Sequence, residues 1–178
     1  MTEWLDIVDD RDRVIGRDTR TLVHAGGHFH RSSHIVLFNK RGEVFVQLRS
    51  MSKDSGAGLW DTSAAGHVDS GESYLACAVR ELHEELGIKV HDQELILIGK
   101  LPPDARTGLE FTQVYRVCSE QALVLQADEI DDGRWLMPDE LAEWMARRGD
   151  QFTEGFKLIW SMLTERQALL LPDNSDGL

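Results

Sequence analysis

The segment GHVDSGESYLACAVRELHEELGI, residues 66–88, decides the fold of this chain. Its second half has a helical period, in which Ser73 is a natural N-cap and Gly87 is the residue type that ends helices in the left-handed conformation. Four apolar residues of this helix share an arc of roughly 60°, and three glutamates lie on about the opposite side. These residues are Leu75, Val79, Leu82 and Leu86, and Glu81, Glu84 and Glu85. The segment therefore predicts a helix from about Ser73 to Leu86 with a core face and a carboxylate face.

The three carboxylates are close neighbours, and no basic residue lies one turn C-terminal to them within the helix. Two carboxylates about 5 to 6 Å apart repel by about 3 kcal/mol at an effective dielectric constant of about 20. No Lys or Arg follows the glutamates within the helix. A solvated acidic stripe is one interpretation of such a pattern. A divalent cation with oxygen ligands is the other, and glutamates with bound water suit Mg²⁺ or Mn²⁺.

The loop before the helix narrows this choice. Gly66 and Gly71 make a tight loop that leads to Glu72 and the helix. The spacing is Gly, five residues, Glu, seven residues, Arg-Glu-aliphatic, one residue, Glu-Glu, one residue, Gly-aliphatic. This spacing matches the Nudix box at all nine fixed positions, so the chain resembles the Nudix hydrolase superfamily. The match favours the cation over the acidic stripe.

The resemblance implies Mg²⁺-dependent hydrolysis of a diphosphate linkage, a reaction on acid anhydrides in phosphorus-containing compounds. Glu81, Glu84 and Glu85 would bind the metal, and the carbonyl of Ala65 would add another ligand. Arg80 would orient Glu72 and the metal-binding glutamates rather than hold the substrate. The general base would be Glu85 or Glu84, with Glu110 and Glu129 as candidates outside the box.

The remaining sequence predicts an α/β fold. Hairpins are expected in residues 1–20 and 34–48, further strands at 94–100, 111–118 and 133–136, and helices from Pro138 to about Arg148 and from Thr153 to about Ala168. Residues 172–178 are polar and predict a frayed tail. Strands that alternate with helices, together with the Nudix resemblance, indicate one α/β/α sandwich with a mixed sheet over residues 1–178.

Composition excludes several classes of partner. The 178 residues carry a net charge of −12, which argues against a nucleic acid polymer or an anionic membrane as partner. No apolar run is long enough to span a bilayer, and the N-terminus lacks the features of a secretory signal, so a cytoplasmic location is expected. Cys77 and Cys118 stand alone in the sequence and are expected to be free thiols. A small diphosphate is the expected partner.

A second resemblance covers roughly residues 20 to 135 and is to isopentenyl-diphosphate isomerase and its Nudix relatives. It implies that His30, His67 and Glu110 bind a metal, and that Arg49 and Lys53 hold the diphosphate. Two departures count against isomerase activity. Ala65 stands where that family has its catalytic cysteine, and Gly108 replaces the first glutamate of a pair that ends at Glu110.

Several alternatives stay open at this point. His24, His28, His30 and His34 form a dense group that either binds a second metal or contains two or three solvated loop histidines. A non-catalytic Nudix ligand sensor is a further alternative, although such modules commonly lose box carboxylates and this chain keeps all of them. The substrate, the number of metal ions and the oligomeric state are undetermined; a homodimer paired through the N-terminal hairpin is one arrangement.

Overall fold

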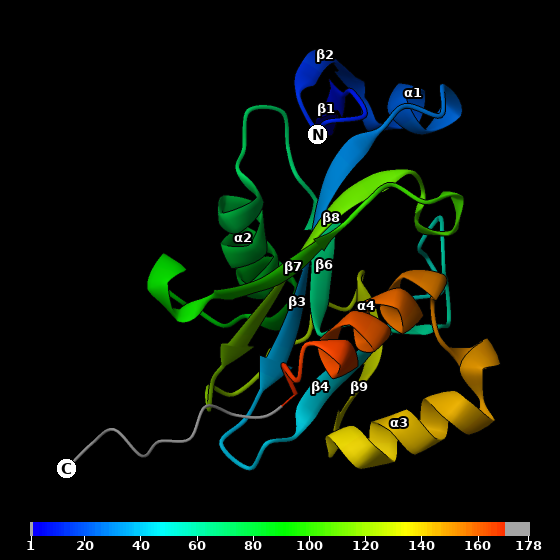
Figure 1. The fold of residues 1–178 in the computed structure, drawn as a ribbon. Coiled ribbons are helices and arrows are strands. Elements are labelled where there is room, and N and C mark those ends of the chain that lie inside the picture. Colours follow the sequence, from blue (N-terminus) through cyan, green and yellow to red (C-terminus); the bar gives the residue numbers. More distant parts are fainter. Residues whose placement is uncertain (1, 170–178) are drawn as a thin grey trace.

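The computed structural model describes residues 2–169, and the expected tail at 172–178 lies outside this range. A mixed sheet of seven strands runs through the centre of the molecule (Figure 1), with the order β5-β4-β3-β8-β7. β6 also pairs with β3, and β9 with β4. The strands are β3 (His30–Phe38), β4 (Val44–Arg49), β5 (Trp60–Asp61), β6 (Ala64–His67), β7 (Ile96–Leu101), β8 (Glu110–Cys118) and β9 (Ile130–Leu136).

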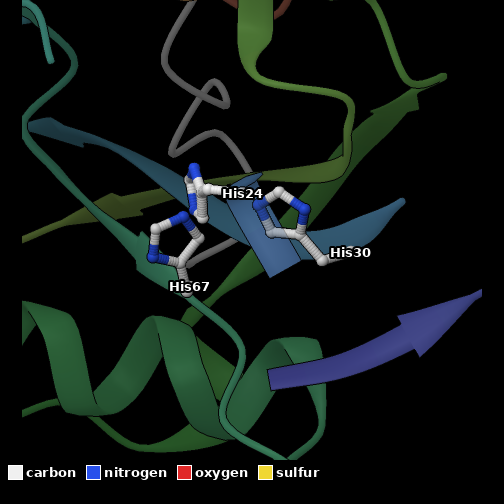
Figure 2. Close-up of side chains that lie close together, drawn as sticks. All are labelled: His24, His30 and His67. Carbon is white, nitrogen blue, oxygen red and sulfur yellow. The ribbon is translucent and has the colours of Figure 1, made fainter. Parts of the chain in front are cut away.

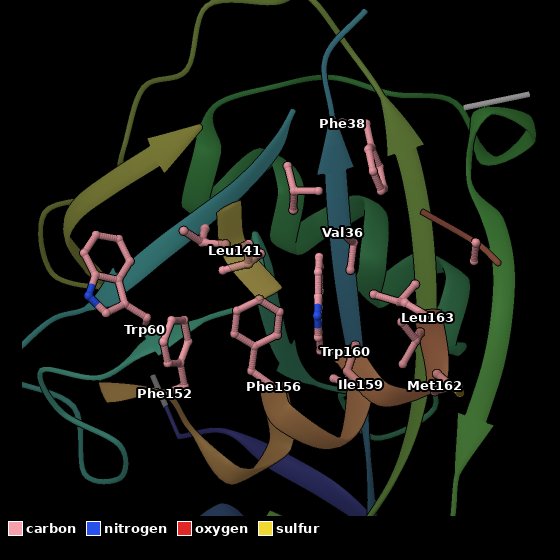
Figure 3. Close-up of a cluster of buried hydrophobic side chains, with 14 residues drawn as sticks. Val36, Phe38, Trp60, Leu141, Phe152, Phe156, Ile159, Trp160, Met162 and Leu163 are labelled. Atoms are coloured by element: carbon pink, nitrogen blue, oxygen red, sulfur yellow. The ribbon is translucent and has the colours of Figure 1, made fainter. Parts of the chain in front are cut away.

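Helices cover both faces of this sheet. One face is covered by α2 (Tyr74–Leu86), and the other by α3 (Pro138–Arg147) and α4 (Glu154–Glu165). Alternate residues of β3 serve the two faces, because successive side chains of a strand point in opposite directions. Val36 and Phe38 join the α4 core, which Figure 3 shows, whereas Ile35 and Leu37 join the α2 core. The α/β/α sandwich with a mixed sheet is therefore confirmed.

The hairpin expected at residues 34–48 has arms that separate soon after the turn. Phe38 pairs with Val44 beside the turn, and β3 then pairs in parallel with β8 from His30 to Phe38. β4 instead pairs with β9 and β5. This separation places the N-terminal ends of β3 and β8 together, so that His30 lies opposite Glu110.

A small N-terminal unit packs against one end of the sandwich (Figure 1). It consists of the antiparallel strands β1 (Trp4–Val8) and β2 (Val14–Thr19), followed by α1 (Arg20–Ala25), a helix that the sequence pattern did not predict. The Asp12 carboxylate in the turn accepts hydrogen bonds from Arg31, Lys100 and Tyr74. These contacts tie the hairpin to β3, β7 and α2. No helix within residues 2–169 is long and apolar enough to cross a membrane.

Candidate active site

Helix α2 begins and ends as its sequence predicts. The Ser73 hydroxyl accepts a hydrogen bond from the Ala76 amide at 3.1 Å, and Gly87 has a φ of 70° at the C-terminal end. The helix packs on β6 and β3, so its first turns face the strand that carries Ala65 and Gly66. At Gly66 a Cβ would lie 1.8 Å from Glu81 Oε1, so any side chain there would displace this carboxylate. Glycine at position 66 therefore allows the Glu81 carboxylate to lie directly against the backbone of β6.

The three glutamates are not equivalent, contrary to the expectation of a carboxylate face opposite the core. Glu81 and Glu85 are buried and Glu84 is exposed. Glu85 Oε2 accepts hydrogen bonds from Gln47 Nε2 at 2.9 Å and from the Ala65 amide at 3.3 Å. The simple helical projection misses this, because β4 and β6 reach along the flank of α2 and cover two of its three glutamates.

Burial makes these carboxylates difficult to ionise without a counter-charge. Desolvation is the largest cause that raises the pKa of Glu81 to about 7 and the pKa of Glu85 to about 8. The negative charge of Glu129 contributes to both shifts, and Glu81 and Glu85 are close enough for the charge of Glu81 to raise the pKa of Glu85. A divalent cation would add positive charge to that of Arg80, and its preferred ligands are carboxylate oxygens such as those found here. The residues therefore fit a Mg²⁺ or Mn²⁺ site.

Arg80 joins the parts of this site together. Its guanidinium donates to both oxygens of Glu72 at 3.0 and 2.9 Å, to Glu81 Oε1 at 2.6 Å and to Glu84 Oε2 at 3.0 Å. It also donates to the His67 carbonyl at 3.0 Å. Every donor is thus engaged with the protein, which is the geometry of an orienting residue and leaves little capacity for a substrate phosphate.

A cavity of about 930 Å³ opens beside the glutamates. The two residues expected to hold a diphosphate, Arg49 and Lys53, both line it. Arg49 lies 3.3 Å from the Asp61 carboxylate and donates to the Ser55 carbonyl, and Lys53 pairs with Glu129. Arg20 and Arg106 also line this cavity. Neither was named from the sequence, although Arg106 lies in the segment 102–108, which is expected to help recognise the leaving group. Nothing local distinguishes them from surface arginines, since α1 and the loop at 102–108 reach the site only in the folded chain.

Glu129 was a weak sequence candidate that the structure brings to the glutamate cluster. The chain after β8 runs along the C-terminal end of α2, where the Val124 and Gln126 amides donate to the Leu86 and Glu85 carbonyls, each at 2.9 Å. This path places Glu129 on the cavity wall with Glu84 and Glu85. Its side chain is still 35% exposed, directly before β9, so a role for Glu129 in the site stays a prediction.

A second cluster consists of histidines around His67, the last residue of β6. One ring nitrogen each from His24, His30 and His67 lies within 4.8 Å of the others. Figure 2 shows the three rings gathered together, with His24 from α1, His30 from β3 and His67 from β6. Glu110 Oε1 lies 3.3 Å from His67 Nε2 and 3.5 Å from His30 Nε2. Of the residues expected from the isomerase resemblance, His30, His67 and Glu110 are therefore together, and His24 joins them.

The histidine cluster has the chemistry of a metal site. The His30 side chain is fully buried, and its Nε2 has no hydrogen-bond partner, because Glu110 is too distant for a good bond. Burial alone would lower the pKa of His67, but hydrogen bonds to Glu110 and Glu3 outweigh it and raise this pKa to about 9. Burial opposes ionisation of Glu110 as well, yet the two histidines hold its pKa well below the ordinary value. The cluster thus joins a carboxylate to imidazoles, which are common divalent-metal ligands.

The dense histidine group in the sequence is divided by the fold. His24 and His30 point into the cluster, whereas the His34 ring makes a hydrogen bond to Thr62 Oγ1 at 2.8 Å. Burial lowers the pKa of His34. The His28 carbonyl lies 3.0 Å from His30 Nδ1 and so orients that ring. His24 and His28 are exposed, and metal binding by this group stays a prediction.

Comparison with known proteins agrees with this geometry. The NUDIX domain model matches residues 28–156. The chain belongs to the NUDIX domain family. A Nudix hydrolase of Clostridium acetobutylicum, named as uncharacterized, is 36% identical over 165 residues, which cover 86% of this chain and 80% of that protein. The crystal structure of a Deinococcus radiodurans protein superposes with a TM-score of 0.75 at 27% identity, over 92% of this chain and 98% of the other. The present Nudix protein is accordingly a hydrolase of pyrophosphate bonds.

The second resemblance also has a counterpart among the relatives. An isopentenyl-diphosphate Delta-isomerase of Serratia proteamaculans is 32% identical over 161 residues, which cover 89% of this chain and 90% of that enzyme. The departure at Gly108 has a structural reason in this Nudix protein, because its φ of 78° disfavours any residue with a side chain. β8 therefore presents Glu110 to the histidines without a second glutamate from position 108.

Proposed function

We propose that this Nudix hydrolase cleaves a diphosphate linkage in a small metabolite, such as a nucleoside diphosphate derivative, in the cytoplasm and with Mg²⁺ or Mn²⁺ as cofactor. The observation that carries the proposal is the pair of buried carboxylates, Glu81 and Glu85, on the wall of a cavity that also contains Arg49 and Lys53. Buried acids beside a basic anchor suit a substrate that is itself an anion and arrives with cations.

In this proposal Glu81, Glu84 and Glu85 hold the cation, with the Ala65 carbonyl as a further ligand. When bound, divalent cations shield the phosphoryl oxygens and make the attacking water more acidic. Glu84 or Glu85 accepts the proton of that water, and Glu129 and Glu110 are the alternative bases. Arg80 fixes the directions of Glu72, Glu81 and Glu84. Arg49 and Lys53 hold the diphosphate, although each must exchange a protein carboxylate for a phosphate oxygen.

The histidine cluster is proposed to bind a second divalent cation through His30, His67 and Glu110, with His24 beside them. β6 separates the two sites, since Glu81 lies against Gly66 and the His67 ring belongs to the cluster. Both sites border one cavity. A homodimer through the N-terminal hairpin remains part of the proposal, because β2 exposes Val14 and Ile15.

The cavity wall guides the choice of substrates to test. Among the described residues that line it, none is Phe, Trp or Tyr. A nucleobase would therefore have to stack on imidazole or guanidinium groups rather than on a large aromatic ring. Sugar, polyol and isoprenoid diphosphates accordingly belong in the panel beside nucleoside diphosphate derivatives.

The test is a panel of these diphosphates assayed for phosphate or monophosphate release, with and without Mg²⁺. Glu84→Gln and Glu85→Gln should lower turnover at least about 100-fold for one or both variants, as expected when a metal ligand or base is removed. His83→Gln is the matched control, because His83 is exposed on the same helix. Wild-type turnover in both glutamine variants would overturn the site.

Product analysis separates the two alternatives. An isomerase converts an allylic diphosphate without releasing phosphate, and Ala65 in place of cysteine counts against that outcome. A ligand sensor would bind the diphosphate and release no product from any member of the panel.

A further inference from the structure

Glu3 lies at the edge of the histidine cluster, where neither box nor family resemblance places a functional residue. Its Oε1 is 3.1 Å from His67 Nδ1, and the opposite ring nitrogen, Nε2, is 3.3 Å from Glu110 Oε1. The imidazole of His67 is therefore held between two carboxylates. Glu3 also lines the cavity and lies 3.6 Å from the Arg20 guanidinium.

The N-terminal hairpin holds Glu3 firmly in this position. The Ser70 amide donates to the Trp4 carbonyl at 2.8 Å, and the Leu5 side chain is fully buried. Asp6 accepts hydrogen bonds from the Ser70 hydroxyl at 2.7 Å and from the Gly71 amide at 3.1 Å. β1 is thus bound to the loop that leads into α2. The position of Glu3 is set by the same loop that belongs to the Nudix box.

A carboxylate at this place has a definite chemical consequence. A metal-binding histidine commonly gives its second ring N–H to a carboxylate or carbonyl, which fixes the tautomer and the ring orientation. With its proton on Nδ1 and directed at Glu3, the ring presents the lone pair of Nε2 to His24, His30 and Glu110. The unpartnered, fully buried Nε2 of His30 belongs to the same cluster and is an independent sign that a ligand belongs there.

We propose that Glu3 is a positioning residue for a metal ion in the histidine cluster, and that the N-terminal hairpin is therefore part of the active site. The inference rests on the proposed function in one respect, namely that the histidine cluster binds a divalent cation. It does not depend on which diphosphate is cleaved, or on whether any is.

The test measures metal affinity rather than turnover. Co²⁺ is titrated into the full chain with excess Mg²⁺ present, so that the oxygen-rich glutamate site is occupied and the visible absorption reports nitrogen ligands. His67→Ala identifies the signal of the histidine cluster. Glu3→Ala should weaken this Co²⁺ binding about 10- to 100-fold. Glu3→Gln should weaken Co²⁺ binding less than Glu3→Ala does, because the glutamine amide oxygen still accepts a hydrogen bond from His67 Nδ1.

Asp10→Ala is the matched control, since it removes an exposed carboxylate from the turn of the same hairpin. Its Co²⁺ affinity should equal that of the wild type. At a pH above the His67 pKa of about 9, where the ring of the metal-free chain is neutral, the nitrogen NMR shifts of His67 should show a proton on Nδ1 in the wild type and in Glu3→Gln, and a mixture of tautomers in Glu3→Ala.

The outcomes are separable from those of the hydrolase assay. Wild-type Co²⁺ affinity in a folded Glu3→Ala, with loss in His67→Ala, would refute the role of Glu3. Unchanged Co²⁺ affinity in His67→Ala would also overturn the inference, because the cluster would then not bind the metal. If Glu3→Ala does not fold, Glu3→Gln and the NMR tautomer still decide the question. Failure of every diphosphate in the panel would contradict the proposed function and leave these results standing.

Discussion

Gly66→Ala offers the most direct test of how β6 and α2 share the glutamate site. The added Cβ would lie 1.8 Å from Glu81 Oε1, about 1.6 Å short of the 3.4 Å at which ordinary contact begins. The carboxylate must therefore withdraw from β6. Because a misplacement of about 1 Å at a reacting centre costs about 100-fold in rate, we expect turnover to fall by at least that factor.

The effect on folding should be smaller than the effect on turnover. The withdrawal strains the 2.6 Å contact between Arg80 and Glu81, and a hydrogen bond between charged groups contributes about 1.5 to 3 kcal/mol. Glu81 can rotate rather than move the strand, so the unfolding free energy should fall by about 1 to 2 kcal/mol, which a domain of ordinary stability tolerates. Urea denaturation gives the stability, and steady-state kinetics with saturating Mg²⁺ gives kcat.

Two controls test whether the loss of turnover in Gly66→Ala comes from the clash with Glu81. Gly16→Ala adds the same methyl group where nothing lies within 4 Å, and should retain wild-type kcat. If the clash with Glu81 is the sole cause, adding Gly66→Ala to Glu81→Ala should change kcat by less than about 2-fold, because the two changes act on one contact. Wild-type kcat in Gly66→Ala, or fully additive losses in the double variant, would refute this account.

Three further perturbations follow from the contacts described above. Asp12→Asn should destabilise the chain at neutral pH but not at low pH. Burial opposes ionisation of Asp12, yet the hydrogen bonds from Lys100, Arg31 and Tyr74 outweigh burial and lower the pKa of this carboxyl group. The stabilisation by Asp12 is therefore present above the unfolded-state pKa of about 4 and is lost as the pH falls through the lower folded-state pKa. Thermal unfolding between pH 7 and pH 3 measures this, and a stability gap independent of pH would contradict it. Lys53→Ala should raise KM at least about 10-fold with kcat changed far less, because it removes a cation that binds ground state and transition state alike; a fall in kcat at unchanged KM would assign Lys53 to the chemistry instead. Phe156→Ala should lower the unfolding free energy by about 3 to 5 kcal/mol in urea denaturation, since this fully buried ring packs between Phe152 and Trp160; a loss below about 1 kcal/mol would mean that the α4 core collapses around the gap.

Much of the secondary structure could be predicted because its signals are local. Ser73 and Gly87 mark the two ends of α2, one by side-chain chemistry and the other by backbone freedom. Pro138 is the first residue of α3, and Thr153 is the N-cap of α4. α1 was missed, because its six residues are too few to show a helical period. The separation of β3 from β4 was missed as well, since the partner of a strand depends on segments far along the chain.

The candidate site likewise has features set by the local sequence and features set by long-range contacts. The sequence by itself determined the identity of the box residues and their order along one helix, because side-chain chemistry and a period of 3.6 residues are properties of the local chain. Only the tertiary structure decided that Glu81 and Glu85 are buried while Glu84 is exposed, that Glu129 lines the same cavity, and that Glu3 and His24 join His30, His67 and Glu110. The physical reason is that burial and charge proximity depend on which strands pair and which loops cross, and these contacts join residues as far apart as positions 3 and 110.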